Sequence, residues 1–221
     1  MNSNQFKILF LVQIITLFLV GMLFIRQPKN ESGKPMSDSG QKAVAKNSVV
    51  SVRYSDKFIY GKADAKNELI IFSRYSCGFC RDFYTEEFDS LLTNYVNTGK
   101  LKIVFMNFVN PADKKAMLMA KITEAGIPLN KYAALQKLYY SESPEDSVAI
   151  VEAAIKTGIN EEDLKKELAN PKMMESIMQD NSEGDRLHIT GTPTFILNGN
   201  VFVGYKGYEA FNNSLKELMK P

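Results

Sequence analysis

The chain has only two cysteines and one histidine among its 221 residues. A zinc site normally takes four ligands, and His188 stands far along the chain from Cys77 and Cys80, so a zinc site is disfavoured. A purely structural disulfide is also a poor explanation, because closing so short a loop adds little chain-entropy stabilisation. The net charge of +2 gives no reason to expect nucleic acid as a partner. A redox-active dithiol is the better interpretation of the pair.

The two cysteines stand where a predicted strand gives way to a predicted helix. The run from Leu69 to Phe72 is apolar and β-rich, and the residues after Cys80 become helical. The residues that share one face of this helix are Phe88, Leu91, Leu92, Tyr95 and Val96. Such a turn places the Cys77 sulfur beside unpaired backbone N–H groups at the positive end of a helix dipole, which favours the thiolate. We therefore predict Cys77 as the nucleophile and Cys80, one turn further on and partly covered, as the resolving cysteine.

One long apolar run lies near the N-terminus. Residues 8–25 read ILFLVQIITLFLVGMLFI, which is just long enough to cross a bilayer, and a buried core helix is the alternative. No small-x-small cleavage site follows, so residues 1–25 are expected to form an uncleaved signal anchor. Basic residues flank both ends of the run, so charge does not settle its orientation. A dithiol domain on a membrane tether makes most sense on the oxidising, extracytoplasmic face.

The remainder divides into a tether and one domain. Residues 26–48 are rich in Lys, Ser, Gly, Asn and Pro without periodicity, and are expected to be a flexible linker. The catalytic domain is expected over residues 49–221, with residues 49–52 as a candidate edge strand. Residues 101–106 predict a second long strand, parallel to the strand before the cysteines, and Gly99 is placed to end the intervening helix.

Helix signals fill residues 111–187. A helical pattern runs from Asp113 to Ala125. Further helix starts are predicted where a capping residue or a proline precedes a polar first turn, at Pro128, Ser143, Asn160 and Asn170.

The last part of the chain predicts a hairpin and a closing helix. Asn198-Gly199 separates two apolar runs and is a dipeptide that tight hairpin turns prefer. From Tyr208 to Met219, Phe211 and Leu215 mark an amphipathic helix.

Three segments carry a family resemblance. They are FIYGKADA at residues 58–65, the motif Cys77-Gly78-Phe79-Cys80, and GTPTFILNG at residues 191–199. A C-x-x-C motif alone is weak, but its pairing with the late G-T-P-T-F-x-x-N-G segment is specific. Over about residues 49 to 219 the chain resembles the DsbA-like family of thioredoxin-fold thiol-disulfide oxidoreductases. The resemblance implies an α/β thioredoxin fold with a helical insertion at about 111–187.

The resemblance also implies an active site. In the family the proline at Pro193 is cis and packs against the dithiol. Because it lacks an N–H, it leaves the backbone at Thr192 free to pair with an extended substrate peptide; an ordinary strand-leading proline is the alternative. Gly78 and Phe79 surround the first sulfur, and with Thr192 they are the expected substrate-binding residues. No metal or organic cofactor is implied, because the redox-active disulfide carries the electrons.

The motif departs from the strongest oxidases of the family. Gly78-Phe79 replaces their Pro-His dipeptide and is similar to the Gly-Tyr of disulfide isomerases, among which threonine before the cis-proline is also common. Ile71 stands where many thioredoxin-fold enzymes have a buried acid, so proton transfer at Cys80 must use water or another group. Arg74 and Arg81 flank the motif and are expected to be solvated, although either could stabilise a nearby thiolate.

Other candidate residues have ordinary explanations. His188 is expected at a loop or helix end rather than in the active site. The methionines are expected mainly to fill the core of the inserted helices, with a peptide groove as the alternative. They include Met117, Met119, Met173, Met174 and Met178.

We therefore expect a membrane-anchored oxidoreductase that introduces disulfide bonds into exported proteins. It would act on the periplasmic side of a bacterial cytoplasmic membrane, and by family analogy a quinone-linked, DsbB-like membrane protein would reoxidise it. The Gly-Phe dipeptide leaves a disulfide isomerase or reductase as the alternative. A noncatalytic peptide-binding chaperone on the same fold is a second alternative.

Overall fold

The computed structural model describes residues 49–221. The predicted signal anchor (residues 1–25) and linker (residues 26–48) lie outside the described residues. From residue 49 onward, no helix is both long enough and apolar enough to cross a membrane.

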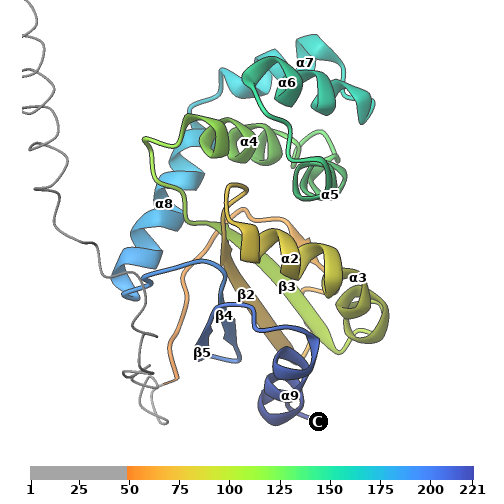
Figure 1. Cartoon of the computed structure of the whole chain (residues 1–221), viewed down its shortest axis with the longest axis vertical. Coiled ribbons are helices and arrows are strands. Elements are labelled where there is room, and N and C mark those ends of the chain that lie inside the picture. Colours follow the sequence, from red (N-terminus) through yellow and green to blue (C-terminus); the bar gives the residue numbers. More distant parts are fainter. Residues whose placement is uncertain (1–48) are drawn as a thin grey trace, which may run out of the picture. The chain divides into compact units, whose positions relative to one another are not determined.

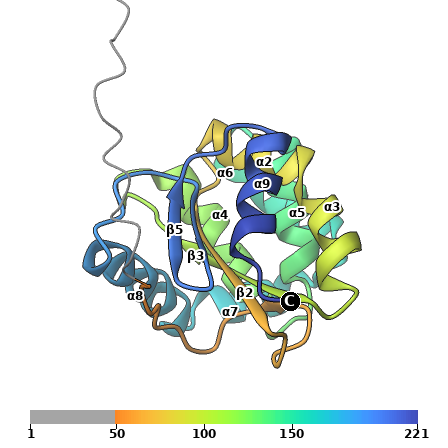
Figure 2. The same cartoon turned by 90° about the horizontal axis from the view of Figure 1, so that it is seen from below.

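A five-stranded sheet in the order β1-β3-β2-β4-β5 forms the centre of the described domain (Figure 1 and Figure 2). The two central strands run parallel, as the sequence predicts, with Leu69 opposite Ile103. The remaining pairs are antiparallel. The strands are β1 (Ile59–Tyr60), β2 (Asn67–Ser73), β3 (Leu101–Asn107), β4 (Thr194–Leu197) and β5 (Asn200–Val203).

Strand β2 is buried on both faces, and this fixes the position of the cysteine motif that follows it. Successive side chains of a strand point to opposite faces. Leu69 and Ile71 belong to the larger core cluster, together with both cysteines, whereas Ile70 and Phe72 belong to a smaller cluster on the other face. A strand covered on both faces carries a continuous apolar run, as this one does.

Helices surround the sheet and fill the interval between β3 and β4. In Figure 1, α4 to α7 lie beyond the end of the sheet where α2 begins, and α8 returns alongside the sheet. Helix α9 closes the chain, as predicted. The helical elements are α2 (Gly78–Glu86), α3 (Phe88–Leu91), the π-helical turn η1 (Leu92–Val96), α4 (Lys114–Ala125), α5 (Tyr132–Glu142), α6 (Ser147–Lys156), α7 (Glu161–Leu168), α8 (Lys172–Arg186) and α9 (Tyr208–Leu218).

Three of the five predicted helix starts are confirmed and two are wrong. At the start of α8, the Asn170 side chain accepts a hydrogen bond from the Lys172 N–H at 3.1 Å. Asp113 and Asn160 cap α4 and α7 through their side chains. Ser143 instead ends α5 in the left-handed conformation, and α6 is capped by Asp146, whose carboxylate accepts a hydrogen bond from the Ala149 N–H at 2.9 Å. The proline after Ser143 disfavours a helical conformation at that residue, which moves the start onward.

The start predicted at Pro128 is displaced to Tyr132. Residues 127–130 form turns, and Asn130 has a φ of 56°, which a right-handed helix cannot include. Helix α5 therefore begins only after this residue.

The predicted edge strand at residues 49–52 is also wrong. The edge beside β3 is formed by β1, and the only backbone bond of this segment given by the structure joins the Val50 N–H to the Gly199 carbonyl at 2.9 Å. Val50, Val52 and Tyr54 pack against the smaller core cluster. Their alternation therefore reflects packing on a face of the sheet rather than pairing at its edge.

The hairpin between β4 and β5 is confirmed. Asn198 and Gly199 have φ values of 50° and 84°, the left-handed pair that a tight turn of this kind needs, and Leu197 faces Asn200 across it. Strand β4 also pairs with β2, so that the residues just before β4 reach the end of β2 where the cysteines lie.

Candidate active site

Cys77 is the N-cap of α2, at the junction where β2 turns into the helix. Its Sγ accepts a hydrogen bond from the Cys80 N–H at 3.4 Å, which is one of the donors that a helix start leaves unpaired. The side chain is mostly buried but lies next to the exposed residues Gly78 and Phe79. The predicted strand-to-helix turn is therefore present.

The electrostatics of the pair separate the two thiols. The pKa of Cys77 is lowered from 9.0 to about 6, mainly by a hydrogen bond from the Cys80 thiol, against the opposing effect of burial. The Cys80 N–H and the positive charge of Arg74 lower it further. Cys80 is only 1% exposed, and burial raises its pKa far above the ordinary range. At neutral pH the pair is thus a thiolate at Cys77 and a thiol at Cys80.

The segment before β4 lies against this dithiol. The Thr192–Pro193 peptide bond is cis, and Pro193 is buried. The Sγ of Cys77 lies 3.1 Å from the Thr192 carbonyl oxygen, so the thiol form donates to it. The structure therefore brings the late G-T-P-T segment and the C-x-x-C motif together, although 115 residues separate Cys77 from Thr192.

Gly78 and Phe79 form the exposed surface between the two cysteines. Phe79 is 62% exposed, and a Cβ placed on Gly78 would meet nothing within 4 Å. An apolar ring this exposed beside a reactive sulfur is available to a bound peptide.

A family model described as Thioredoxin matches residues 54–217. The chain belongs to the thioredoxin family.

Within the thioredoxin family, the chain is similar to proteins named for disulfide bond formation. It is 25% identical over 158 residues to a probable disulfide bond formation protein D of Bacillus anthracis, covering 67% of this chain and 72% of the relative. The disulfide bond formation protein D of Bacillus subtilis (strain 168) is 21% identical over 170 residues, covering 73% of this chain and 77% of the relative.

Two solved structures show the same fold. Alpha-DsbA1 from Wolbachia pipientis aligns with a TM-score of 0.68 at 20% identity, over 76% of this chain and 92% of that one. Oxidised BdbD from Bacillus subtilis aligns with a TM-score of 0.67 at 22% identity, over 79% and 100%. The family, the relatives and the dithiol identify a DsbA-like thiol-disulfide oxidoreductase of thioredoxin fold. The C-x-x-C motif and the late G-T-P-T-F-x-x-N-G segment predict the same family.

The flanking arginines of this oxidoreductase differ in what they touch. Both are exposed, as expected. Arg74 adds to the stabilisation of the Cys77 thiolate, whereas Arg81 donates a hydrogen bond to the Ser143 hydroxyl at 3.1 Å. Arg81 therefore links α2 to the end of α5.

The remaining candidates lie where their ordinary explanations place them, with two exceptions. His188 is an exposed residue just after α8. Met117 and Met119 are buried in the core, and Met173 packs against it. Met174 and Met178 are instead exposed on α8. In the described part of the chain, no group of three or more His, Cys, Asp or Glu side chains is placed to hold a metal.

Sequence reasoning missed three polar residues around the dithiol. Ser76 hydrogen-bonds to Asp113, which lowers the pKa of that carboxyl and ties the start of α4 to the residue before Cys77. Ser73 lies two residues after Ile71 in β2, so the period of the strand places it on the same face as the cysteines. Tyr140 belongs to α5, and no local sequence pattern indicates that it lies near the dithiol.

The lowered pKa of Cys77 predicts a thiolate titration in the reduced, full-length protein. We expect ultraviolet absorbance of the thiolate to rise with a midpoint of about pH 6, instead of 9.0. Arg74→Ala and Cys80→Ala, which lacks a side-chain donor, are expected to raise the midpoint, with the larger shift for Cys80→Ala, whereas Arg81→Ala serves as the matched control and leaves it in place. A midpoint near 9.0 in the unaltered protein would contradict this account.

The same shift makes the stability of the reduced protein depend on pH. Between about pH 6 and 9.0 the folded state has released the Cys77 proton while the unfolded state still holds it, so stability rises with pH across this window. This contribution to stability decreases as pH falls from 9.0, and it is lost once pH has fallen through about 6. The oxidised protein has no thiol to titrate and should lack this dependence.

Proposed function

We propose that this oxidoreductase introduces disulfide bonds into exported proteins through a Cys77–Cys80 disulfide. The observation that supports this direction is the stabilised Cys77 thiolate, whose pKa of about 6 lies well below that of an ordinary thiol. Whatever stabilises the reduced form makes the disulfide a stronger oxidant. The printed names of the curated relatives, disulfide bond formation protein D, favour the same direction.

The proposed reaction is a dithiol-disulfide exchange. A substrate thiolate attacks Cys77 Sγ, the Cys77–Cys80 bond breaks, and its electron pair stays on Cys80 Sγ. A second substrate thiolate then attacks the substrate sulfur of the mixed disulfide and releases Cys77 as a thiolate. Two electrons and two protons leave the substrate dithiol; one proton ends on Cys80 and the other in solvent, because Cys77 remains ionised near neutral pH.

Substrate binding is assigned to the surface around the motif. The Thr192 backbone beside Cys77 would pair with an extended peptide, and Pro193 would hold that backbone in place. The exposed Phe79 ring and the open surface at Gly78 would contact apolar side chains of the substrate. Such main-chain pairing with one apolar anchor suits many different unfolded substrates.

The cellular setting is part of the proposal. Residues 1–25 would anchor the protein in a bacterial cytoplasmic membrane, with the catalytic domain on the extracytoplasmic side, where disulfides persist. A quinone-linked, DsbB-like membrane protein would take the electrons from the reduced pair. The composition of residues 8–25 supports the anchor.

A disulfide isomerase or reductase is the second candidate. The Gly78-Phe79 dipeptide and Thr192 favour it, as both are similar to the residues of isomerases at these positions. A noncatalytic chaperone is less well supported, because the chain keeps both cysteines beside the cis-proline.

The reduction potential of the pair separates these candidates. We would equilibrate the full-length protein in detergent against glutathione mixtures and measure the oxidised fraction by thiol labelling. A disulfide donor should have a potential well above the value of about −270 mV typical of thioredoxin, towards the value of about −120 mV of strong oxidants. A value at or below about −270 mV would overturn the oxidase proposal in favour of a reductase.

A further inference from the structure

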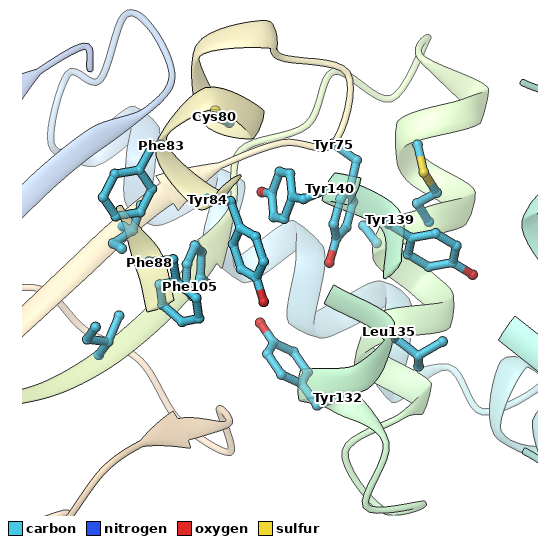
Figure 3. Close-up of a cluster of buried hydrophobic side chains, with 14 of the residues drawn as sticks. Tyr75, Cys80, Phe83, Tyr84, Phe88, Phe105, Tyr132, Leu135, Tyr139 and Tyr140 are labelled. Atoms are coloured by element: carbon cyan, nitrogen blue, oxygen red, sulfur yellow. The ribbon is translucent and has the colours of Figure 1, made fainter. Parts of the chain in front are cut away.

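Two buried hydroxyl groups lie near Cys80, since Ser73 forms a hydrogen bond with the Cys80 thiol and Tyr140 belongs to the same core cluster as Cys80. The Ser73 Oγ and the Tyr140 OH are 2.6 Å apart, and both residues are almost fully buried, at 5% and 2% exposure. Ser73 is the last residue of β2, on the face that carries Ile71, whereas Tyr140 belongs to the inserted helix α5. Figure 3 shows the Tyr140 ring between Tyr84 and Tyr75, with its hydroxyl directed toward the helix that carries Cys80.

Cys80 needs a partner at this place. Whenever it leaves a disulfide or attacks one, its sulfur carries negative charge, and water has little access to a side chain that is 1% exposed. Many thioredoxin-fold enzymes have a buried acid beside this cysteine, but here Ile71, which is fully buried, occupies that position. The charge must therefore be stabilised by groups other than a carboxyl at residue 71.

We propose that the Ser73 hydroxyl stabilises the Cys80 thiolate as it forms, and that Tyr140 is a positioning residue that directs the Ser73 proton to that sulfur. The proposal rests on the dithiol function proposed above, and it gives the helical insertion a direct part in the exchange chemistry.

The interactions of each group agree with this assignment. A hydrogen bond with Ser73 lowers the pKa of Cys80, against the larger effect of burial, which is the effect of a donor aimed at the anion. When the Ser73 proton is used in this way, Tyr140 must be the donor in the 2.6 Å contact. Tyr140 can serve because burial, and then the charge of Cys80, raise its pKa well above its usual value.

The Tyr140 hydroxyl is held in place by packing. Its ring centroid lies 4.7 Å from that of Tyr75 and 4.7 Å from that of Tyr84. Tyr75 is itself fixed by a hydrogen bond to the Thr123 hydroxyl at 2.9 Å. A donor with so little freedom loses little entropy when it orders Ser73.

The step at Cys80 can be measured separately from the step at Cys77. With reduced full-length protein and oxidised glutathione, the Cys77 thiolate first forms a mixed disulfide and releases one glutathione thiolate. The Cys80 sulfur then attacks Cys77 Sγ, the bond to the second glutathione breaks, and that glutathione leaves carrying the proton that Cys80 gives up. Acid quenching and mass spectrometry follow both steps in one reaction.

We expect Ser73→Ala to slow the second step by at least about tenfold, since hydrogen bonds to charged groups are among the stronger ones. The first step should stay within about twofold, because neither hydroxyl contributes to the pKa of Cys77. Ser73→Thr, which keeps a hydroxyl, should restore most of the rate. Tyr140→Phe should slow the second step by a smaller factor, and should add nothing in the Ser73→Ala background.

Tyr139→Phe is the matched control. Tyr139 is the neighbouring residue in α5, fully buried, and its hydroxyl donates to the Ile150 carbonyl at 3.0 Å, so the variant loses a comparable bond away from the dithiol. Second-step rates of Ser73→Ala and Tyr140→Phe equal to those of Tyr139→Phe would overturn the inference. So would equal slowing of both steps, or failure of Ser73→Thr to restore the rate. If the unaltered protein forms no mixed disulfide at Cys77, the proposed function fails instead.

Discussion

Cys80→Ser is expected to hold this protein on its substrates as a stable mixed disulfide. The Cys77 thiolate would still form, because the serine hydroxyl can donate in place of the Cys80 thiol and the N–H of residue 80 is kept. Once Cys77 is joined to a substrate, no second protein sulfur can displace that substrate. The complexes should be visible as bands on non-reducing gels of cells that express the full-length variant, and they should disappear on reduction.

Cys77→Ser is expected to abolish exchange altogether. Cys80 is too deeply buried to meet a substrate, and its high pKa leaves it a thiol. Disulfide formation in a model substrate should fall to the uncatalysed level, and no trapped complexes should appear. The Cys77→Ser, Cys80→Ser double variant is the control, and if it still supports disulfide formation, the enzyme assignment is wrong. Trapping by Cys77→Ser instead of Cys80→Ser would reverse the assigned roles.

A buried ion cluster lies where the inserted helices meet the sheet. The Lys57 Nζ lies 2.7 Å from Asp180 Oδ2 and 3.4 Å from Glu124 Oε1, and all three side chains are almost completely buried. Lys57 also donates to the Ser176 hydroxyl at 2.6 Å. Asn107, at the end of β3, donates to both carboxylates. One cation therefore connects the segment before β1 to α4 and α8.

Lys57→Met is expected to destabilise the fold by about 3–5 kcal/mol, because it leaves two carboxylates buried without their cation. Removing one partner of a buried ion pair lowers the stability of the fold by more than the intact pair raises it, because the other charge stays buried without a partner. The variant should therefore unfold at a markedly lower urea concentration than the unaltered protein. Lys137→Met is the matched control: its ion pair with Asp89 is exposed on both sides and 3.8 Å long, so its loss should change stability little.

The defect of Lys57→Met should shrink in acid. Burial raises the pKa of Asp180 from 3.8 to about 6 even with Lys57 present. Between these values the folded state holds the proton and the unfolded state does not, so rising pH costs stability in this window. Without the cation the window extends upward, and the loss should be larger at about pH 8 than at about pH 5. A loss independent of pH would mean that packing, rather than charge, explains the defect.

Much of this protein follows from short stretches of its sequence. The strand-turn-helix around Cys77, the hairpin at Asn198-Gly199, and the helix starts at Asp113 and Asn160 all appear as predicted. In each case the deciding interaction joins residues a few positions apart, so that local patterns are sufficient. The edge strand at residues 49–52 failed because an alternating pattern states which residues are buried but not whether they pack or pair.

Only the tertiary structure decided which buried polar groups meet. Ser73 meets Tyr140 across 67 positions, and Lys57 meets Asp180 across 123. A serine at a strand end, a tyrosine in a helix and a lysine in a loop are each ordinary residues, and no local pattern marks them. Their chemistry arises because the inserted helices pack against the ends of β2 and β3 and exclude water. Each buried polar group then has only the partners that packing brings to it.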